Sequence, residues 1–289
     1  MENQRRTGLV LEGGGMRGIY TAGVLDVFLE HDIAFDGVIG VSAGALHGCS
    51  YVAGQHGRSI RYYKKYCRDR RFMSLYNILH TGDIADEQFC YHDIPERLDP
   101  YDYEAFDRSN TEFYVTCSNV ETGRAEHLRI TDMRGQVDLM RASASLPCIS
   151  RIVDTAGLHL LDGGCTDSIP VMAMRRMGYR RIVAVLTRQR GYRKKPENTL
   201  AHRHIYRDYP AFVQAVKWRH LAYNRTLEHL ERLEAEGKIF VIAPEEALPI
   251  GRLSHNSRRL QEVYDIGRRD AEKSWERMLA WRDKGCKER

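Results

Sequence analysis

Two short segments of this 289-residue chain place residue types suited to ester chemistry beside glycines. Gly40-Val41-Ser42-Ala43-Gly44 has the pattern G-x-S-x-G, and Asp162 precedes Gly163 and Gly164. A serine hydroxyl becomes a nucleophile when a neighbouring group accepts its proton. Small neighbours also allow the sharp turn that exposes such a hydroxyl. These residues predict Ser42 as a nucleophile and Asp162 as its base.

The surroundings of Ser42 favour this interpretation. The apolar run Val38 to Val41 predicts a buried strand, and the small residues from Ala43 to Ala53 predict a helix. The G-x-S-x-G pattern has chemical meaning only in that strand-turn-helix setting. The alternative is a glycine-lined turn that packs a helix on a strand around an inert serine.

The apolar run Leu158 to Leu161 predicts a strand that leads into Asp162. Asp-Gly is also one of the commonest turn pairs, so an ordinary turn is the alternative. Aspartate has a reference pKa of about 3.9 against about 6.5 for histidine, which leaves it about 3.5 kcal/mol less drive to accept a proton. We therefore expect Asp162 to be partly desolvated and within hydrogen-bond reach of the Ser42 hydroxyl.

A glycine-rich loop, Gly13-Gly14-Gly15-Met16-Arg17-Gly18, follows the predicted strand Thr7 to Glu12 and precedes a helical pattern over Ile19 to Glu30. Amides at the start of a helix favour negative charge, so the loop from Gly13 to Arg17 is a candidate oxyanion hole. The loop also matches G-x-G-x-x-G, with Asp36 near the spacing of a ribose contact. A nucleotide-binding Rossmann-like module is thus a competing hypothesis, although it leaves Ser42 unexplained.

A Ser-His-Asp triad stays open, because several histidines follow Asp162 in the order found in α/β-hydrolases. They are His202, His204, His220, His229 and His255, and no pattern favours any of them. We expect His47 and His56 to be packing or surface residues. His159, three residues before Asp162 on a strand, should face the opposite side of the sheet.

Other polar residues near these motifs receive structural interpretations. Asp167 and Ser168 precede Pro170, whose fixed φ suits a first helical turn, and we expect them to cap that helix. No cluster of histidine, cysteine or carboxylate residues has the spacing of metal ligands, so no metal is predicted.

Three blocks, in this order, resemble the patatin-like phospholipase family: the glycine loop with Arg17, the elbow around Ser42, and Asp162-Gly163-Gly164. The segment from Ala142 to Pro147 also resembles the family's small-residue segment that ends in proline. The resemblance covers about residues 8 to 172. It implies a bacterial-type patatin-like acyl hydrolase with a Ser-Asp dyad, an acyl-serine intermediate and no cofactor. Its substrates would be phospholipids, lysophospholipids, acylglycerols or simple esters.

The elements predict an α/β protein, which the resemblance specifies as a three-layer patatin-like fold with a mainly parallel central sheet flanked by helices. Beyond the motifs we expect a helix over 209–236, a strand over 239–243 and a charged helical tail over about 254–282. A hydrolase domain is predicted over 1–245, with its motif-bearing core at about 8–190, and a helical extension over 246–289. The tyrosine-rich residues 58–110 are expected to form a cap or lateral insertion. A catalytically silent scaffold of this fold is the third hypothesis.

The composition is that of an ordinary globular protein, with 43% hydrophobic and 29% charged residues and a net charge of +5. This mild positive charge argues against a nucleic-acid partner. The resemblance implies a lipid or ester substrate. The basic run Arg188, Arg190, Arg193, Lys194 and Lys195 is either a solvated loop or a contact with anionic lipid head groups.

Seven cysteines without a CxxC pair predict a cytoplasmic protein, with peripheral membrane contact as an open alternative. The uncharged run 37–57 is expected to be a strand, a turn and a buried helix.

Overall fold

The computed structural model describes residues 6–287, and a mixed sheet of eight strands forms its middle layer. Five neighbouring strands in the order β3-β2-β1-β7-β8 are parallel. These are β1 (Thr7–Leu11), β2 (Gly37–Val41), β3 (Glu112–Asn119), β7 (Arg181–Val185) and β8 (Ile239–Ile242). Antiparallel strands β4 (Arg124–Ile130), β6 (Leu158–Asp162) and β5 (Val153–Thr155) complete the sheet.

Strand β1 lies where the strand order changes direction. The chain continues from β1 to β2 on one side, and it returns later to place β7 on the other side. In open parallel sheets, the crevice at the carboxyl ends of the strands beside such a switch point is where ligands bind. The glycine loop after β1 and the Ser42 turn after β2 both lie at this end.

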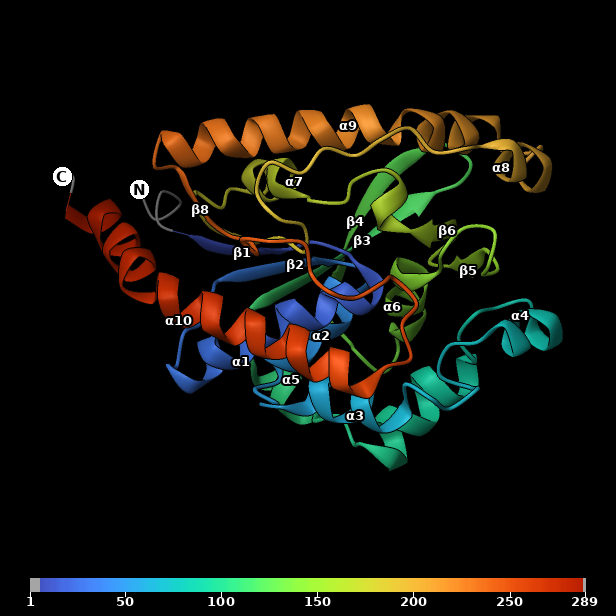
Figure 1. Cartoon of the computed structure of the whole chain (residues 1–289), viewed down its shortest axis with the longest axis horizontal. Coiled ribbons are helices and arrows are strands. Elements are labelled where there is room, and N and C mark those ends of the chain that lie inside the picture. Colours follow the sequence, from blue (N-terminus) through green and yellow to red (C-terminus); the bar gives the residue numbers. More distant parts are fainter. Residues whose placement is uncertain (1–5, 288–289) are drawn as a thin grey trace.

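Helices cover both faces of the sheet, which gives three layers (Figure 1). Helices α1 (Ile19–Glu30), α2 (Ala43–Val52) and α10 (Ser257–Lys287) cover one face, and α7 (Val171–Arg176) and α9 (Pro210–Ala235) cover the other. Because side chains alternate along a strand, Leu9 and Leu11 of β1 enter the first core and Val10 enters the second. The predicted three-layer α/β fold with a mainly parallel sheet is confirmed.

Helix α10, the predicted charged tail, packs along α1. Gly23 of α1 and Gly267 of α10 permit the close approach, since a Cβ atom on Gly267 would lie 2.1 Å from the Tyr20 carbonyl oxygen. The Tyr264 hydroxyl donates to Asp26 at 2.6 Å across the same contact. The division into a domain over 1–245 and an extension over 246–289 stays a prediction, while α10 shares one core with α1.

Residues 58–110 form short helices on the α1–α2 side of the sheet. They are α3 (Arg58–Tyr66), α4 (Leu75–Thr81), the π-helix η3 (Phe89–Leu98) and α5 (Tyr103–Arg108). Ion pairs between Asp99 and two arginines anchor the segment. Buried Asp99 accepts a hydrogen bond from Arg61 at 2.7 Å and lies 3.6 Å from the buried Arg58 guanidinium. The uncharged run 37–57 is β2, a turn and α2, as predicted. No helix within residues 6–287 combines the length and the hydrophobicity needed to cross a bilayer.

Two short elements have no signal in the sequence. Strand β5 pairs with β6 through a tight turn in which Ala156 and Gly157 both have positive φ, 52° and 71°. Alanine rarely adopts that backbone conformation, so the sequence does not indicate this hairpin. Helix α8 (Leu200–Ile205) has no buried residue and therefore no hydrophobic periodicity.

Candidate active site

Ser42 lies on a sharp turn between β2 and α2 with a strained backbone, φ 54° and ψ −125°. Such a conformation costs on the order of 1–3 kcal/mol for a residue with a side chain. Its neighbours must be glycines because the packing is close. A Cβ on Gly40 would lie 2.5 Å from the Ala45 backbone, and one on Gly44 would lie 2.5 Å from the Leu11 carbonyl oxygen. The end of β1 and the first turn of α2 therefore hold Ser42 in place.

The end of α6 (Val137–Ala144) and the residue that follows it connect the two predicted catalytic residues. The Ser143 hydroxyl accepts a hydrogen bond from the Ser42 amide at 2.9 Å and donates to the Thr116 carbonyl of β3 at 2.8 Å. The Ser145 carbonyl accepts from the Asp162 amide at 2.8 Å. The small-residue segment from Ala142 to Pro147 thus fixes the backbones of Ser42 and Asp162 relative to each other.

Asp162 ends β6 and is 4% exposed. Its Oδ1 accepts from the Gly164 amide at 2.7 Å, whereas its Oδ2 is buried without a hydrogen-bond partner in the described part of the chain. Burial raises the pKa of the carboxyl, and the Ser42 hydroxyl, the Gly164 amide and Arg219 act in the opposite direction. No hydrogen bond of ordinary geometry joins the two side chains, yet the hydroxyl is near enough to stabilise the carboxylate.

The glycine loop lies directly against the elbow, since a Cβ on Gly13 would lie 3.2 Å from the Ser42 Cβ. Its shape depends on Gly15, which has φ 57°. Glu12 anchors the loop by accepting from the Thr187 amide at 2.6 Å and the Tyr223 hydroxyl at 2.5 Å.

The amides of this loop differ in their hydrogen bonds. The Met16 amide donates to the Arg252 carbonyl at 3.0 Å, and the Arg17 amide donates to the Gly14 carbonyl at 3.3 Å. No acceptor among residues 6–287 pairs with the amides of Gly13 and Gly14. The amides of Met16 and Arg17 thus already have acceptors, and the oxyanion hole itself stays a prediction.

Two cavities meet at Ser42. One is polar and contains Gly13, Gly14, Asp162 and Gly164, and also five basic side chains: Arg17, Arg188, Lys194, Arg219 and Arg252. The other is apolar, and Met16 lines it. Ser42, Gly15 and Leu146 border both cavities.

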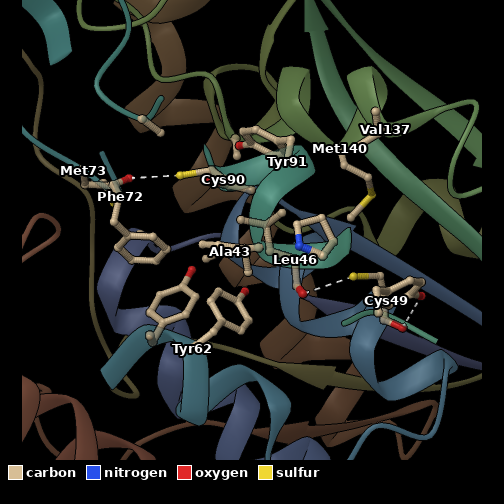
Figure 2. Close-up of a pocket in the computed structure, with 18 of the residues that line it drawn as sticks. Ala43, Leu46, Cys49, Tyr62, Phe72, Met73, Cys90, Tyr91, Val137 and Met140 are labelled. Atoms are coloured by element: carbon tan, nitrogen blue, oxygen red, sulfur yellow. Dashed lines mark hydrogen bonds between the residues drawn. The ribbon is translucent and has the colours of Figure 1, made fainter. Parts of the chain in front are cut away.

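The apolar cavity has a volume of about 140 Å³ and is enclosed mainly by α2, α6 and the segment 58–110. Figure 2 shows rings and thioethers gathered around it, among them Tyr62, Phe72, Tyr91 and Met140. An engineered apolar cavity of about 150 Å³ takes up benzene, so this volume accommodates part of one acyl chain rather than two chains side by side.

All twelve histidines lie in the described part of the chain, and none lines either cavity. His47 is buried against Tyr63 with ring centroids 5.0 Å apart, and burial lowers its pKa to about 3, which keeps it neutral. His56 is on the surface beside Glu30, and His159 pairs with Asp154. The packing and surface roles expected for His47 and His56 are confirmed, and no histidine is placed to complete a triad.

Two polar contacts correct the sequence interpretation. Asp36 lies at the amino end of β2, where it accepts from the Thr7 amide at 2.6 Å. The glycine loop follows the opposite end of β1, so Asp36 cannot hold a ribose bound there, and the nucleotide hypothesis loses its acidic partner.

Asp167 and Ser168 do not cap α7, which has no side-chain cap. Asp167 lies 3.1 Å from His127, and the Ser168 hydroxyl donates to the Gly164 carbonyl at 2.8 Å inside the polar cavity.

Sequence reasoning missed two of the five basic side chains of the polar cavity, Arg219 and Arg252. Arg219 lies on α9 against Gly164, 3.3 Å from where a Cβ of that glycine would be, and Arg252 packs on Gly15. Neither belongs to a motif, and no signal in the sequence points to them. Arg188 and Lys194 belong to the basic run that was interpreted as a solvated loop or a head-group contact, and they line the cavity.

The three-layer α/β fold brings the G-x-S-x-G turn, the glycine loop and Asp162 together at one end of the sheet. Residues 9–175 match the model of the patatin-like phospholipase family, and residues 209–282 match a domain of unknown function, DUF6363. Because the first match covers more than half of the chain, the protein belongs to the patatin-like phospholipase family and is a lipid ester hydrolase. The predicted family membership and enzyme class are confirmed.

Similar proteins include the uncharacterized protein YjjU of Escherichia coli, which is 29% identical over 91% of this chain and 75% of its own length. Lysophospholipase NTE1 of Eremothecium gossypii is 30% identical over 62% of this chain. The chain spans only 12% of that fungal protein. Among solved structures, VipD from Legionella pneumophila aligns over 97% of this chain and 67% of its own, with a TM-score of 0.44 and 12% identity.

The strain at Ser42 predicts an unusual order of stabilities. Ser42→Gly should unfold with a free energy about 1 kcal/mol higher than Ser42→Ala, because glycine adopts positive φ without strain. At Ser50, in the interior of α2, the order should reverse, with alanine more stable than glycine by about 1 kcal/mol. Urea denaturation of the four variants measures both differences. Equal stabilities at position 42 would contradict a strained elbow.

Proposed function

We propose that this enzyme cleaves carboxylic esters of phospholipids or related lipids, with Ser42 as nucleophile and Asp162 as proton acceptor. The Ser42 Oγ attacks the ester carbonyl carbon while its proton passes to Asp162. The amides of Gly13 and Gly14 hold the oxyanion that forms on the carbonyl oxygen. Asp162 returns the proton to the leaving alkoxide, and a water molecule then hydrolyses the acyl-serine with Asp162 again as base.

The observation that carries this proposal is the unpartnered Oδ2 of Asp162, which is buried in the cavity that Ser42 borders. A buried oxygen without a partner is costly unless it has a role, and here the strained turn directs a hydroxyl into the same space. Burial raises the pKa of Asp162 and so offsets part of the disadvantage of aspartate as a base. The apolar cavity on the other side of Ser42 suits an acyl chain.

Removal of either catalytic group should abolish ester cleavage. We expect Ser42→Ala and Asp162→Asn to lower kcat/KM for p-nitrophenyl butyrate by roughly 10³-fold or more, because each removes half of one proton-transfer pair. Asp162→Asn should keep or raise the Tm at pH 7, since it removes a buried charge and retains the oxygen that accepts from Gly164. Full activity in either folded variant would refute the dyad.

The pH profile tests Asp162 as the base. Activity requires the deprotonated carboxylate, so kcat/KM should fall as the pH drops through its pKa, and burial places this limb above the reference value of about 3.9. Arg219 lowers that pKa, so Arg219→Gln should shift the limb to higher pH. Arg225→Gln, an exposed position on the same helix, is the control and should leave the limb in place. An unshifted limb in Arg219→Gln would exclude Asp162 as the titrating group.

Contact with a membrane surface is the second part of the proposal. Helix α4 projects from the body with Leu75 and Leu79 exposed at 75% and 84%, and α8 exposes Leu200 and Ile205 at the same end of the molecule (Figure 1). The last turn of α8 also carries basic residues. Exposed apolar side chains beside cations are typical of an interfacial contact with anionic lipids. The predicted cytoplasmic location stays a proposal, with which the six free cysteines of the described chain agree.

Vesicle sedimentation tests this contact. Leu79→Asp should lower binding to vesicles with anionic lipid several-fold, because it replaces an inserted apolar side chain by a charge that the surface repels. Leu221→Asp on α9, an exposed leucine on the other face of the sheet, is the matched control and should bind as the wild type does. Equal binding by Leu79→Asp would exclude α4 as the contact.

A further inference from the structure

The polar cavity beside Ser42 carries more positive charge than the proposed reaction uses. Five basic side chains line it, against the two carboxylates Glu12 and Asp162. Glu12 is already satisfied by neutral donors, Thr187 and Tyr223. The net charge of the lining is therefore positive, and Arg17 among these cations is buried.

Four of these cations have no counter-ion. Among residues 6–287, Arg17, Arg188, Lys194 and Arg252 form no ion pair, and only Arg219 has one, with Glu197 at 3.5 Å. Arg17 is 8% exposed, and its Nε has no hydrogen-bond partner in the same range of residues. A buried guanidinium nitrogen without a partner is costly, and an anion in the cavity would supply that partner.

The cations also disfavour one another. Burial lowers the pKa of Lys194 to about 8, with a further contribution from Arg219. Burial likewise lowers the pKa of Arg17 to about 10, and Arg188 and Arg252 act in the same direction. Glu12 acts in the opposite direction on both groups, and an anion among them would raise both pKa values further.

We infer that this cationic cavity is a subsite for the phosphate of a single-chain lipid whose acyl chain lies in the apolar cavity, so that Ser42 cleaves lysophospholipids with compact anionic head groups. The inference rests on the proposed function and names its substrate class. Its geometry follows from Ser42 and Gly15, which border both cavities and place the ester between the phosphate and the chain.

The volumes of the two cavities support a small substrate. The polar cavity has a volume of about 30 Å³, the room of two or three water molecules, which suits a phosphate monoester better than a bulky head group. The apolar cavity accommodates part of one chain. A diacyl lipid or a lipid with a choline cation would place a second chain or a like charge where neither fits.

Binding is measured first, on the Ser42→Ala variant so that no ligand is consumed. Calorimetric titrations compare a short-chain lysophosphatidic acid, the monoacylglycerol with the same chain, and inorganic phosphate. Lysophosphatidic acid should bind at least about tenfold more tightly than either of the others. Added Lys194→Met should reduce that preference at least about tenfold, whereas Lys195→Met, the exposed neighbour outside the cavity, should preserve it.

Each other outcome overturns the inference. Equal affinity for the two lipids would show that the cations do not contact the head group. Phosphate that binds as tightly as lysophosphatidic acid would identify a site for a free anion instead. Hydrolysis by the wild type then separates the two proposals: cleavage of both esters without preference contradicts this inference alone, and cleavage of neither contradicts the proposed function as well.

Discussion

The close packing of the Ser42 turn on the end of β1 is the constraint on which the rest of the site depends. Gly40 and Gly44 let the turn approach Ala45 and the Leu11 carbonyl so closely that no side chain fits. This packing holds Ser42 at positive φ and places the glycine loop, which continues from β1, directly against it. A strained serine, a loop with free amides and a helix start are therefore products of one contact rather than three separate features.

Two different surfaces surround this contact, an apolar one and a cationic one. On one side, α2, α6 and the segment 58–110 supply aromatic and aliphatic walls. On the other side, α9 and the segments after β7 and β8 supply cations. Because Ser42 lies at the boundary, the substrate that we infer is apolar at one end and anionic at the other, with its ester between them. The cations also act on Asp162, since Arg219 and Arg252 lower the pKa of its carboxyl whereas burial raises it.

The sequence predicts the parts of this site that depend on local backbone geometry. The turn at Ser42 and the glycine loop can be predicted because strain and close packing restrict which residues are allowed at adjacent positions. The hydrophobic patterns of the strands and helices likewise predict the three layers of the fold. Each strand of the parallel sheet is buried on both faces and so forms a continuous apolar run. Asp162 is predicted mainly from the order of its block relative to the others, since Asp-Gly alone indicates an ordinary turn.

The remaining features depend on tertiary contacts between distant segments. Arg219 and Arg252 reach the site from α9 and from the chain after β8, about 180 and 210 residues beyond Ser42, and an arginine on a helix is usually a surface residue. Asp36 had a suitable spacing for a ribose contact but lies at the wrong end of its strand. Spacing along the chain does not report which end of a sheet a residue occupies.

Labelling with a fluorophosphonate tests the central claim, that Ser42 is a nucleophile activated by Asp162, most directly. Peptide mapping by mass spectrometry should locate a single adduct on Ser42 in the wild type, and Asp162→Asn should react much more slowly although it is folded. An adduct on another serine, no adduct in the folded protein, or equal labelling rates with and without the carboxylate would contradict the account.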